Sequence, residues 1–142
     1  MIVAIGCDHG GFELKQRIME KFSADGHVFA DLGCYSTDSV DYPDFAEAVC
    51  ASVIEGKADA GILICGTGIG MSMAANKSKK IRAALCHDHF TARMSREHNN
   101  ANILCLGGRV LGVCVAEDIV HVWLNTPFSG GRHLHRIGKF SD

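Results

Sequence analysis

The chain has 142 residues, a formal net charge of −2 and a hydrophobic fraction of 47%, so we expect one domain with one sizeable core. The lack of a basic excess argues against a nucleic-acid partner, and no apolar run approaches the roughly 20 residues that a membrane-spanning helix needs. Seven cysteines without a CxxC pair argue against a disulfide framework and a zinc site, and they predict a cytoplasmic protein whose thiols mainly fill the core.

Apolar, β-branched runs alternate with helical patterns in the first half of the chain. The predicted elements are a strand at 2–7, a helix at 12–24, a strand at 28–32, a helix at 43–56 and a strand at 61–65. Gly26 lies just after the end of the first helix, and Pro43 suits the first position of the second. The half therefore predicts a strand–helix repeat.

The second half continues this alternation. The predicted elements are a short helix up to about Asn76, a strand at 81–86, a helix at 88–97, a strand at 102–106 and a helix at 113–125. Asp88 is a typical N-cap residue for the helix that follows it. Residues 129–142 are expected to form a polar, basic tail.

Five strands that alternate with helices predict a single Rossmann-like α/β domain over residues 1–142, with a parallel sheet covered by helices on both faces. We expect the strand order 2-1-3-4-5, in which strands 1 and 3 are neighbours. Ligands bind at such a switch point, beyond the carboxyl ends of the strands. The two loops there are "CDHGG" at 7–11 and "CGTGIG" at 65–70.

The glycine-rich loop at 66–70 combines a thiol with a turn that precedes a helix. Glycines allow close approach of the backbone, and free N–H groups before a helix suit an anion. The spacing fits neither a Walker A loop nor a dinucleotide fingerprint, and a tight turn without a ligand is the alternative. Cys65 ends the strand, where a helix N-terminus lowers a thiol pKa from about 8.5 towards neutrality. It could act as nucleophile or base, or be a buried core cysteine.

Further polar residues are candidates of the same kind. Asp8 and His9 follow the first strand and would face the same crevice, unless they only cap a loop and face solvent. His98 and Asn99 suit acid–base work near neutral pH, or a helix C-cap. The candidate anion-binding arginines, which could equally be ordinary surface residues, are Arg109, Arg132 and Arg136.

Several segments, in the same order, resemble those of the type B ribose-5-phosphate isomerase family, which also includes galactose-6-phosphate isomerase subunits. They include "GCDHGGF", "ICGTGIGMSMAANK", "ARMSREHNNANIL" and "GGRHLHRIGK", and the resemblance covers nearly the whole chain. It implies a Rossmann-like fold, no metal or other cofactor, and a homodimer or dimer of dimers that shares its sites between subunits. The implied reaction interconverts ribose 5-phosphate and ribulose 5-phosphate through an enediolate.

The resemblance also implies a role for each candidate. Cys65 would be the base, His98 would open the sugar ring, and Asp8 would bind sugar oxygens and help to move their protons. The enediolate oxygens would be held by Thr67 and by the amides of Gly66, Thr67, Gly68, Ile69 and Gly70. The phosphate would be held by His9, Arg109, Arg132 and Arg136, with the basic tail at 129–142 contributing, and Asn99 would bind a sugar or enediolate oxygen.

Two details refine this expectation. One branch of the family uses a glutamate at the position of Met71 instead of a cysteine, so Cys65 assigns this chain to the cysteine branch. The chain also keeps Cys65, His98 and the basic tail together, so a homo-oligomer can build a complete site. The alternatives are an isomerase of allose 6-phosphate or a tetrose phosphate, and a non-catalytic binder of phosphorylated metabolites or nucleotides.

Overall fold

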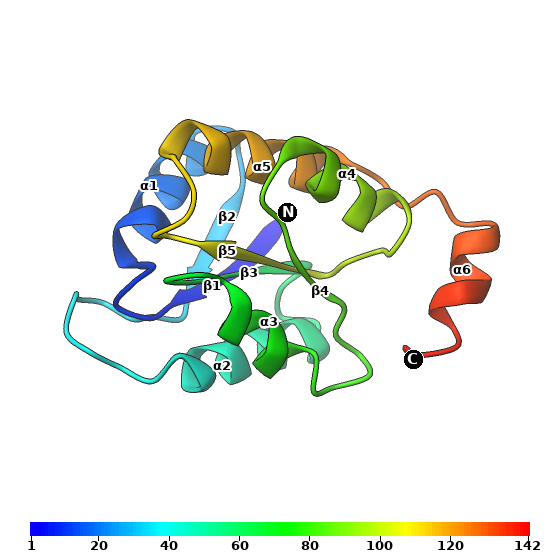
Figure 1. Ribbon diagram of the computed structural model, residues 1–142, viewed down its shortest axis with the longest axis horizontal. Helices are drawn as coiled ribbons and strands as arrows, with labels where there is room; N and C mark the ends of the chain where they lie inside the picture. The colour runs from blue at the N-terminus through cyan, green and yellow to red at the C-terminus, as the bar shows by residue number, and fades with distance from the viewer.

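Parallel strands alternate with helices along the whole chain (Figure 1), and the computed structural model describes all 142 residues. The strands are β1 (Ile2–Cys7), β2 (Val28–Asp31), β3 (Ala60–Cys65), β4 (Ala83–Leu85) and β5 (Ile103–Gly107). The helices are α1 (Phe12–Ser23), α2 (Tyr42–Ile54), α3 (Ile69–Ala75), α4 (His89–Glu97), α5 (Val113–Asn125) and α6 (Arg132–Ile137). The predicted fold class is therefore confirmed.

The order of the last two strands differs from the prediction. The sheet runs β2-β1-β3-β5-β4, so β5 rather than β4 pairs with β3. All of β5 is buried, whereas β4 has only three residues, each partly exposed. A continuous apolar run fits the interior of a parallel sheet, and a short, less buried strand fits its edge. The exchange leaves β1 and β3 adjacent, so the predicted switch point is unchanged.

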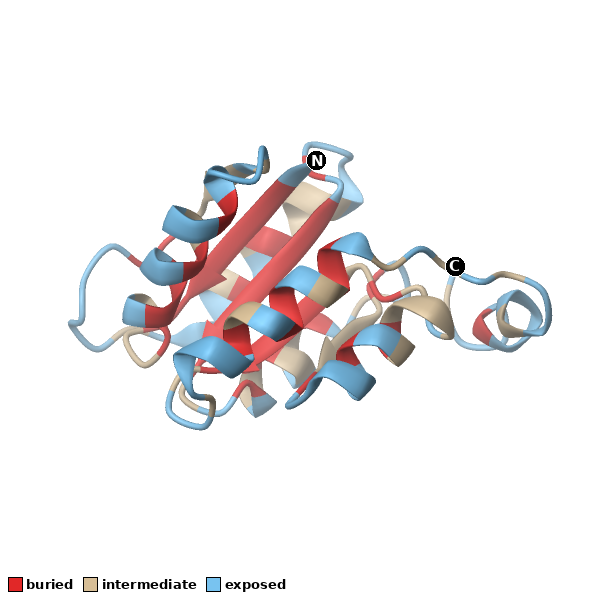
Figure 2. Cartoon of the chain, turned by 90° about the horizontal axis from the view of Figure 1, so that it is seen from above, coloured by how far each residue is buried: buried red, intermediate tan, exposed pale blue.

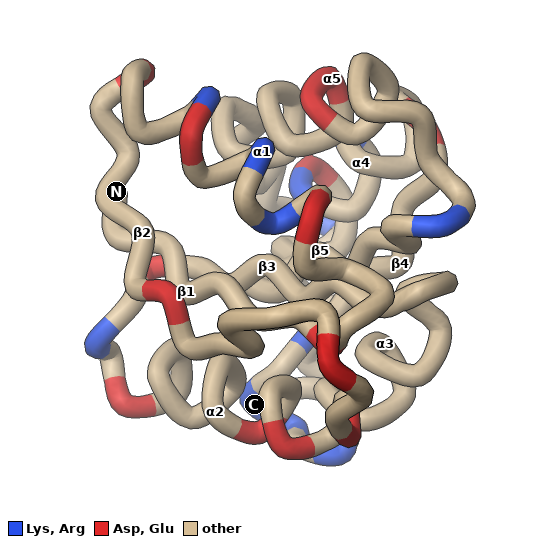
Figure 3. The backbone as a smooth tube through the Cα atoms, turned by 90° about the vertical axis from the view of Figure 1, so that its left-hand side faces the viewer, with Lys and Arg blue, Asp and Glu red and all other residues tan.

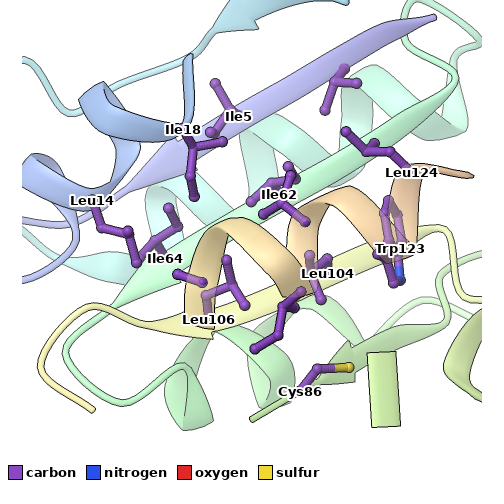
Figure 4. Packing of buried hydrophobic residues seen from close by; sticks show 14 of the residues in the cluster. Ile5, Leu14, Ile18, Ile62, Ile64, Cys86, Leu104, Leu106, Trp123 and Leu124 are labelled. Atoms are coloured by element: carbon purple, nitrogen blue, oxygen red, sulfur yellow. The ribbon is translucent and has the colours of Figure 1, made fainter. Parts of the chain in front are cut away.

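Helices cover both faces of the sheet, with α1, α4 and α5 on one side and α2 and α3 on the other (Figure 1). Alternate residues of each strand point to opposite faces, so the core divides into two clusters. In the first, Ile62 and Leu104 belong to the same buried group as Trp123 (Figure 4). In the second, Leu63 belongs with Met71 of α3. Figure 2 shows the central strands buried and the helices exposed on their outer faces, whereas the short strands β2 and β4 are only partly buried.

Two sequence signals at helix starts are confirmed. The Asp88 side chain accepts a hydrogen bond from the Thr91 amide at 2.7 Å and so caps α4. Pro43 lies in the first turn of α2, where its missing N–H costs nothing.

Basic and acidic residues are interspersed over both helical layers (Figure 3). No helix combines the length and apolar character that crossing a membrane requires.

The basic tail contains a helix that the sequence pattern did not predict. Helix α6 stands apart from the sheet in Figure 1. The chain leaves the body beside α4, where the Ser129 amide donates to the Glu97 carbonyl at 3.0 Å. It returns at its last residue, where the Asp142 amide donates to the Lys79 carbonyl at 3.1 Å. The tail is therefore an arm that is held at both ends.

A fully buried lysine joins α1 to the end of β2. Lys15 Nζ donates to Asp31 Oδ1 and to the Cys34 carbonyl, each at 2.6 Å, and its side chain is 0% exposed. It also lies 5.1 Å from the centre of the Tyr35 ring. A buried cation is tolerated only when charge and hydrogen bonds compensate it, so this pair fixes the loop after β2.

We expect Asp31→Asn to lower the free energy of unfolding by roughly 2–3 kcal/mol, because it leaves the Lys15 ammonium buried without its counter-charge. Asp31 is 24% exposed, which keeps the loss below that of a fully buried pair. Urea unfolding measures it, with exposed Asp25→Asn as the control. Equal unfolding free energies for the two variants would show that the ion pair contributes nothing.

Candidate active site

The loops that follow β1 and β3 lie side by side at the carboxyl edge of the sheet. The Asp8 amide donates to the Ile64 carbonyl at 3.1 Å, which ties the end of one strand to the other. A Cβ built on Gly10 would lie 3.0 Å from the Gly66 nitrogen, so a larger residue would force the loops apart. The two loops singled out from the sequence therefore form one surface.

The glycine loop turns tightly around the Cys65 sulfur. Gly68 has φ 78°, a left-handed conformation that favours glycine. Its amide donates to Cys65 Sγ at 3.1 Å, and the Ile69 amide donates to Thr67 Oγ1 at 3.2 Å. The sulfur thus faces a backbone donor, and the exposed Thr67 hydroxyl lies in the same loop.

The loop after β5 closes the other side of the glycine loop. The Gly108 amide donates to the Cys65 carbonyl at 2.8 Å, and the Arg109 amide donates to the Gly66 carbonyl at 3.0 Å. A Cβ on Gly66 would lie 3.4 Å from Arg109 Nη1. An exposed guanidinium therefore stands directly beside the loop and gives this edge a fixed positive charge.

A cavity of about 250 Å³ opens at this edge. It is lined by His9, Gly10, Glu13, Leu14, Thr37, Gly108 and Arg109. His9 Nδ1 accepts a hydrogen bond from the Val40 amide at 3.3 Å, so that nitrogen carries no proton and Nε2 is left as the N–H donor. An imidazole N–H donor and a guanidinium in one hollow suit an oxyanion such as a phosphate.

Two of the central candidates are more buried than a crevice residue would suggest. Asp8 is 7% exposed and its Oδ1 accepts from the Gly10 amide at 2.8 Å, so it does stabilise its own turn. Cys65 is 5% exposed and belongs to the core cluster between the sheet and α2 and α3. The exposed part of the Cys65 side chain is thus small, and it does not line the cavity beside His9.

The largest hollow in the molecule is not at this edge. It measures about 500 Å³ and lies between α2 and α3, lined mainly by apolar side chains that include Ala46, Cys50 and Ile54. No candidate residue from the sequence borders it. The polar candidate groups gather instead around the smaller cavity beside the glycine loop.

The remaining candidates lie together at the opposite end of the sheet. His98 follows α4, and its ring stacks on the ring of His133 in α6 with centroids 4.2 Å apart and planes inclined by 11°. Arg132 and Arg136 are exposed on α6. Burial, His98 and the two arginines lower the pKa of His133. Asn99 is exposed beside them.

The candidate residues therefore lie in two separate groups, which we call the first and the second half-site. The first holds Asp8, His9, Arg109 and the 65–70 loop, and the second holds His98, Asn99 and α6. The five residues of β5 separate them by roughly 16 Å, at about 3.3 Å per residue. Figure 1 shows α6 at the far end of the molecule from the loops that follow β1 and β3. Within one chain, the basic tail does not reach the glycine loop.

Three further residues contribute to these two groups, and local sequence patterns do not reveal them. His133 stacks on His98, Val40 orients His9, and Thr37 lines the cavity. The sequence shows that His133 follows Arg132, but the stacking of His133 on His98 depends on how α6 packs near the end of α4. No three His, Cys, Asp or Glu side chains are grouped as the ligands of a metal ion would be.

Comparison with known proteins identifies the family. Residues 3–140 match the Ribose/Galactose Isomerase family. The chain is 45% identical to ribose-5-phosphate isomerase B of Escherichia coli over 135 residues, which cover 95% of this chain and 91% of that protein. It is 40% identical to galactose-6-phosphate isomerase subunit LacB of Clostridium acetobutylicum over 142 residues, which cover 100% and 82%.

Solved structures agree with these matches. The chain superposes on ribose-5-phosphate isomerase B of Clostridium thermocellum with a TM-score of 0.97 and 52% identity, over 98% of this chain and 94% of that one. For a ribose 5-phosphate isomerase of Thermotoga maritima the TM-score is 0.97 at 51% identity, over 99% and 97%. The chain therefore belongs to the family of type B ribose-5-phosphate isomerases and galactose-6-phosphate isomerase subunits.

Proposed function

We propose that this chain is an aldose–ketose isomerase that interconverts ribose 5-phosphate and ribulose 5-phosphate through an enediolate. The observation that carries the proposal is the Cys65 sulfur held at 3.1 Å by the Gly68 amide in a glycine loop that also exposes the Thr67 hydroxyl. The high identity to ribose-5-phosphate isomerases over almost the whole chain supports the same conclusion.

The proton transfer begins with the open-chain aldose. The Cys65 thiolate removes the proton from C2, the electron pair forms the C1–C2 double bond, and the carbonyl oxygen at C1 becomes negative. The thiol then returns a proton to C1, the double bond moves to the C2 oxygen, and the ketose forms once the hydroxyl proton has moved between the two oxygens. Asp8, which lies in the adjoining loop, is the group we assign to the sugar oxygens and their protons.

The charge that develops on the enediolate oxygens needs fixed donors. We assign this role to the Thr67 hydroxyl and to the amides of the loop at 66–70. Donors that already point at the developing charge commonly contribute about 3 kcal/mol each to transition-state stabilisation. The left-handed Gly68 turns its amide towards the Cys65 sulfur, which keeps the loop closed around the proposed base.

We propose that the working enzyme is a homodimer, or a dimer of dimers, in which each site combines one half-site from each of two chains. The separation of roughly 16 Å within one chain supports this, because one chain cannot bring His98 to Cys65. A two-fold axis builds two equal sites from the two kinds of half-site. His98 of one chain then opens the ring of a sugar held by Cys65 of the other.

The phosphate is then held from both sides. We assign His9 and Arg109 of the first half-site and Arg132 and Arg136 of the second to this role, so the tail at 129–142 serves the neighbouring chain. Guanidinium groups bind phosphate through paired, charge-assisted hydrogen bonds.

We also assign the chain to the cytoplasm, because seven unpaired thiols are typical of a reducing compartment.

The direct test offers ribose 5-phosphate to the enzyme and measures ribulose 5-phosphate. A second measurement follows deuterium entry from solvent at C1 of ribulose 5-phosphate. We expect both conversion and exchange, because the proton that Cys65 takes from the sugar can exchange with solvent before the thiol returns it to the enediolate. An enzyme that shows neither would refute the isomerase proposal.

The 40% identity to a galactose-6-phosphate isomerase subunit gives one specific reason to test other sugars. The assigned groups fix a phosphate and a two-carbon reacting unit, but they do not set the length between them. We therefore propose comparing kcat/KM for ribose 5-phosphate, allose 6-phosphate, galactose 6-phosphate and a tetrose 4-phosphate in one preparation. A higher value for a hexose phosphate would change the assigned substrate and leave the chemistry intact.

A further inference from the structure

Two arginines hold the turn that follows α4, and neither forms an ion pair with a carboxylate. Arg96 comes from the last turn of α4, and Arg82 directly precedes β4. Both side chains are half-buried. Burial lowers the pKa of each arginine, and the nearby Arg82 charge lowers that of Arg96 further. Placing two half-buried cations near each other without a counter-charge costs free energy. We therefore expect their contacts to serve a function.

Both guanidinium groups donate to backbone carbonyls of the same turn. Arg82 Nε donates to the Asn100 carbonyl at 2.9 Å, and Arg96 Nη1 donates to the Ala101 carbonyl. The Arg96 guanidinium also lies 5.0 Å from the Trp123 ring, as in a cation–π contact. The turn is thus held by charge-assisted hydrogen bonds from two directions.

Ending the helix does not require these arginines. Asn100 adopts a left-handed conformation with φ 45°, and its amide donates to the Arg96 carbonyl at 3.1 Å. The Ala101 amide donates to the Ser95 carbonyl at 2.9 Å. A left-handed residue with such bonds is a complete helix C-cap, so the arginines add something beyond the cap.

Each arginine also donates a second hydrogen bond, which links the turn to the segment that contains α6. Arg96 Nε donates to the Thr126 carbonyl at 3.3 Å, and Arg82 Nη1 donates to Ser141 Oγ at 2.8 Å. Thr126 and Ser141 lie at the two ends of the segment that contains α6. One guanidinium therefore joins the His98 turn to the start of the arm, and the other joins it to the end.

We propose that Arg82 and Arg96 are positioning residues that keep His98 in register with helix α6. This inference rests on the proposed function, in which His98 opens the ring of a sugar whose phosphate lies on α6. The phosphate and the ring oxygen are a fixed distance apart in one substrate, so the two binding groups must keep a matching distance. A misplacement of about 1 Å at such a site can cost about 100-fold in rate.

The proposal separates two reactions of the same enzyme. Ribose 5-phosphate forms a furanose ring, and its isomerisation needs ring opening by His98. Ribulose 5-phosphate is acyclic, because its only chain position for furanose closure carries the phosphate, so exchange of its C1 proton with solvent needs no ring opening. If the position of His98 relative to α6 changes, the isomerisation of ribose 5-phosphate should therefore slow down. The exchange of the C1 proton of ribulose 5-phosphate should keep its rate.

The test uses Arg96→Lys and Arg82→Lys in the full-length enzyme, because lysine keeps the charge but cannot donate in two fixed directions. We expect kcat for ribose 5-phosphate to fall about 100-fold in Arg96→Lys and less in Arg82→Lys. Deuterium exchange into ribulose 5-phosphate and competitive inhibition by inorganic phosphate should stay near wild-type values. Two variants from different elements keep the test usable if one of them folds poorly.

Arg93→Lys is the matched control, because Arg93 lies on α4 as well but pairs with Glu97 at the surface. It should leave both rates unchanged. Parallel losses of ribose turnover and ribulose exchange would show that the arginines only stabilise the fold and would overturn the proposal. Unchanged ribose turnover in both lysine variants would overturn it as well. The wild-type rates, measured alongside, report separately on the proposed function.

Discussion

Replacing Cys65 by alanine should reduce kcat by about 10²- to 10⁴-fold, because it removes the group that takes the C2 proton. The backbone donors of the glycine loop and the phosphate-binding groups remain, so the substrate should still bind with nearly its normal affinity. Turnover of ribose 5-phosphate and calorimetric titration with the same sugar measure the two effects separately. A loss of binding that matched the loss of turnover would point to a structural role for the sulfur.

Cys50→Ala is the control for this experiment. Cys50 lies in α2 and is 8% exposed, close to the 5% exposure of Cys65. Burial raises the pKa of the Cys50 thiol to about 11, so it stays protonated and unreactive near neutral pH. We expect Cys50→Ala to leave kcat unchanged. If the two alanine variants lost activity equally, the sulfur at position 65 would have no special chemical role.

Mixing two inactive variants should restore activity if each site is shared between chains. A dimer that combines Cys65→Ala with His98→Ala contains one site with both substitutions and one site with neither. Random exchange makes half of the dimers mixed, so about one quarter of the wild-type activity should return. The measurement is ribose 5-phosphate turnover after the two purified variants have been unfolded together and refolded.

Two comparisons decide how this result is interpreted. Mixing Cys65→Ala with a chain that carries both substitutions should restore nothing, because no site then holds both groups. Mixing that leaves the Cys65→Ala and His98→Ala pair inactive, although wild-type chains recover fully after the same treatment, would mean that Cys65 and His98 do not belong to one site. The predicted sharing of the site would then be wrong.

Local patterns in the sequence were sufficient for the five strands, for helices α1 to α5 and for the glycine loop beside Cys65. The strand at 2–7 and the Asp88 cap follow from apolar runs and capping chemistry that depend only on neighbouring residues. The glycine loop follows Cys65 at once, so its closeness to the sulfur needed no folding information. The adjacency of β1 and β3 followed from the general rule for alternating strands and helices.

Other features required the folded chain. The positions of β5 and β4 depend on which run is buried from both sides, and the sequence shows two similar short apolar segments. The helix in the tail is six residues long, and so short a helix is stabilised by its contacts rather than by propensity. Its stacking of His133 on His98 joins residues 35 positions apart.

The sequence by itself determined the alternating α/β fold, the loops at the switch point and the chemical types of the candidate groups, because these depend on periodicity and on residue chemistry. Only the tertiary structure decided that these groups form two half-sites at opposite ends of one sheet. The physical reason is that all strands of a parallel sheet run in the same direction. Residues that precede β5 therefore lie at the amino ends of the strands, and residues that follow β3 lie at the carboxyl ends, one strand length away.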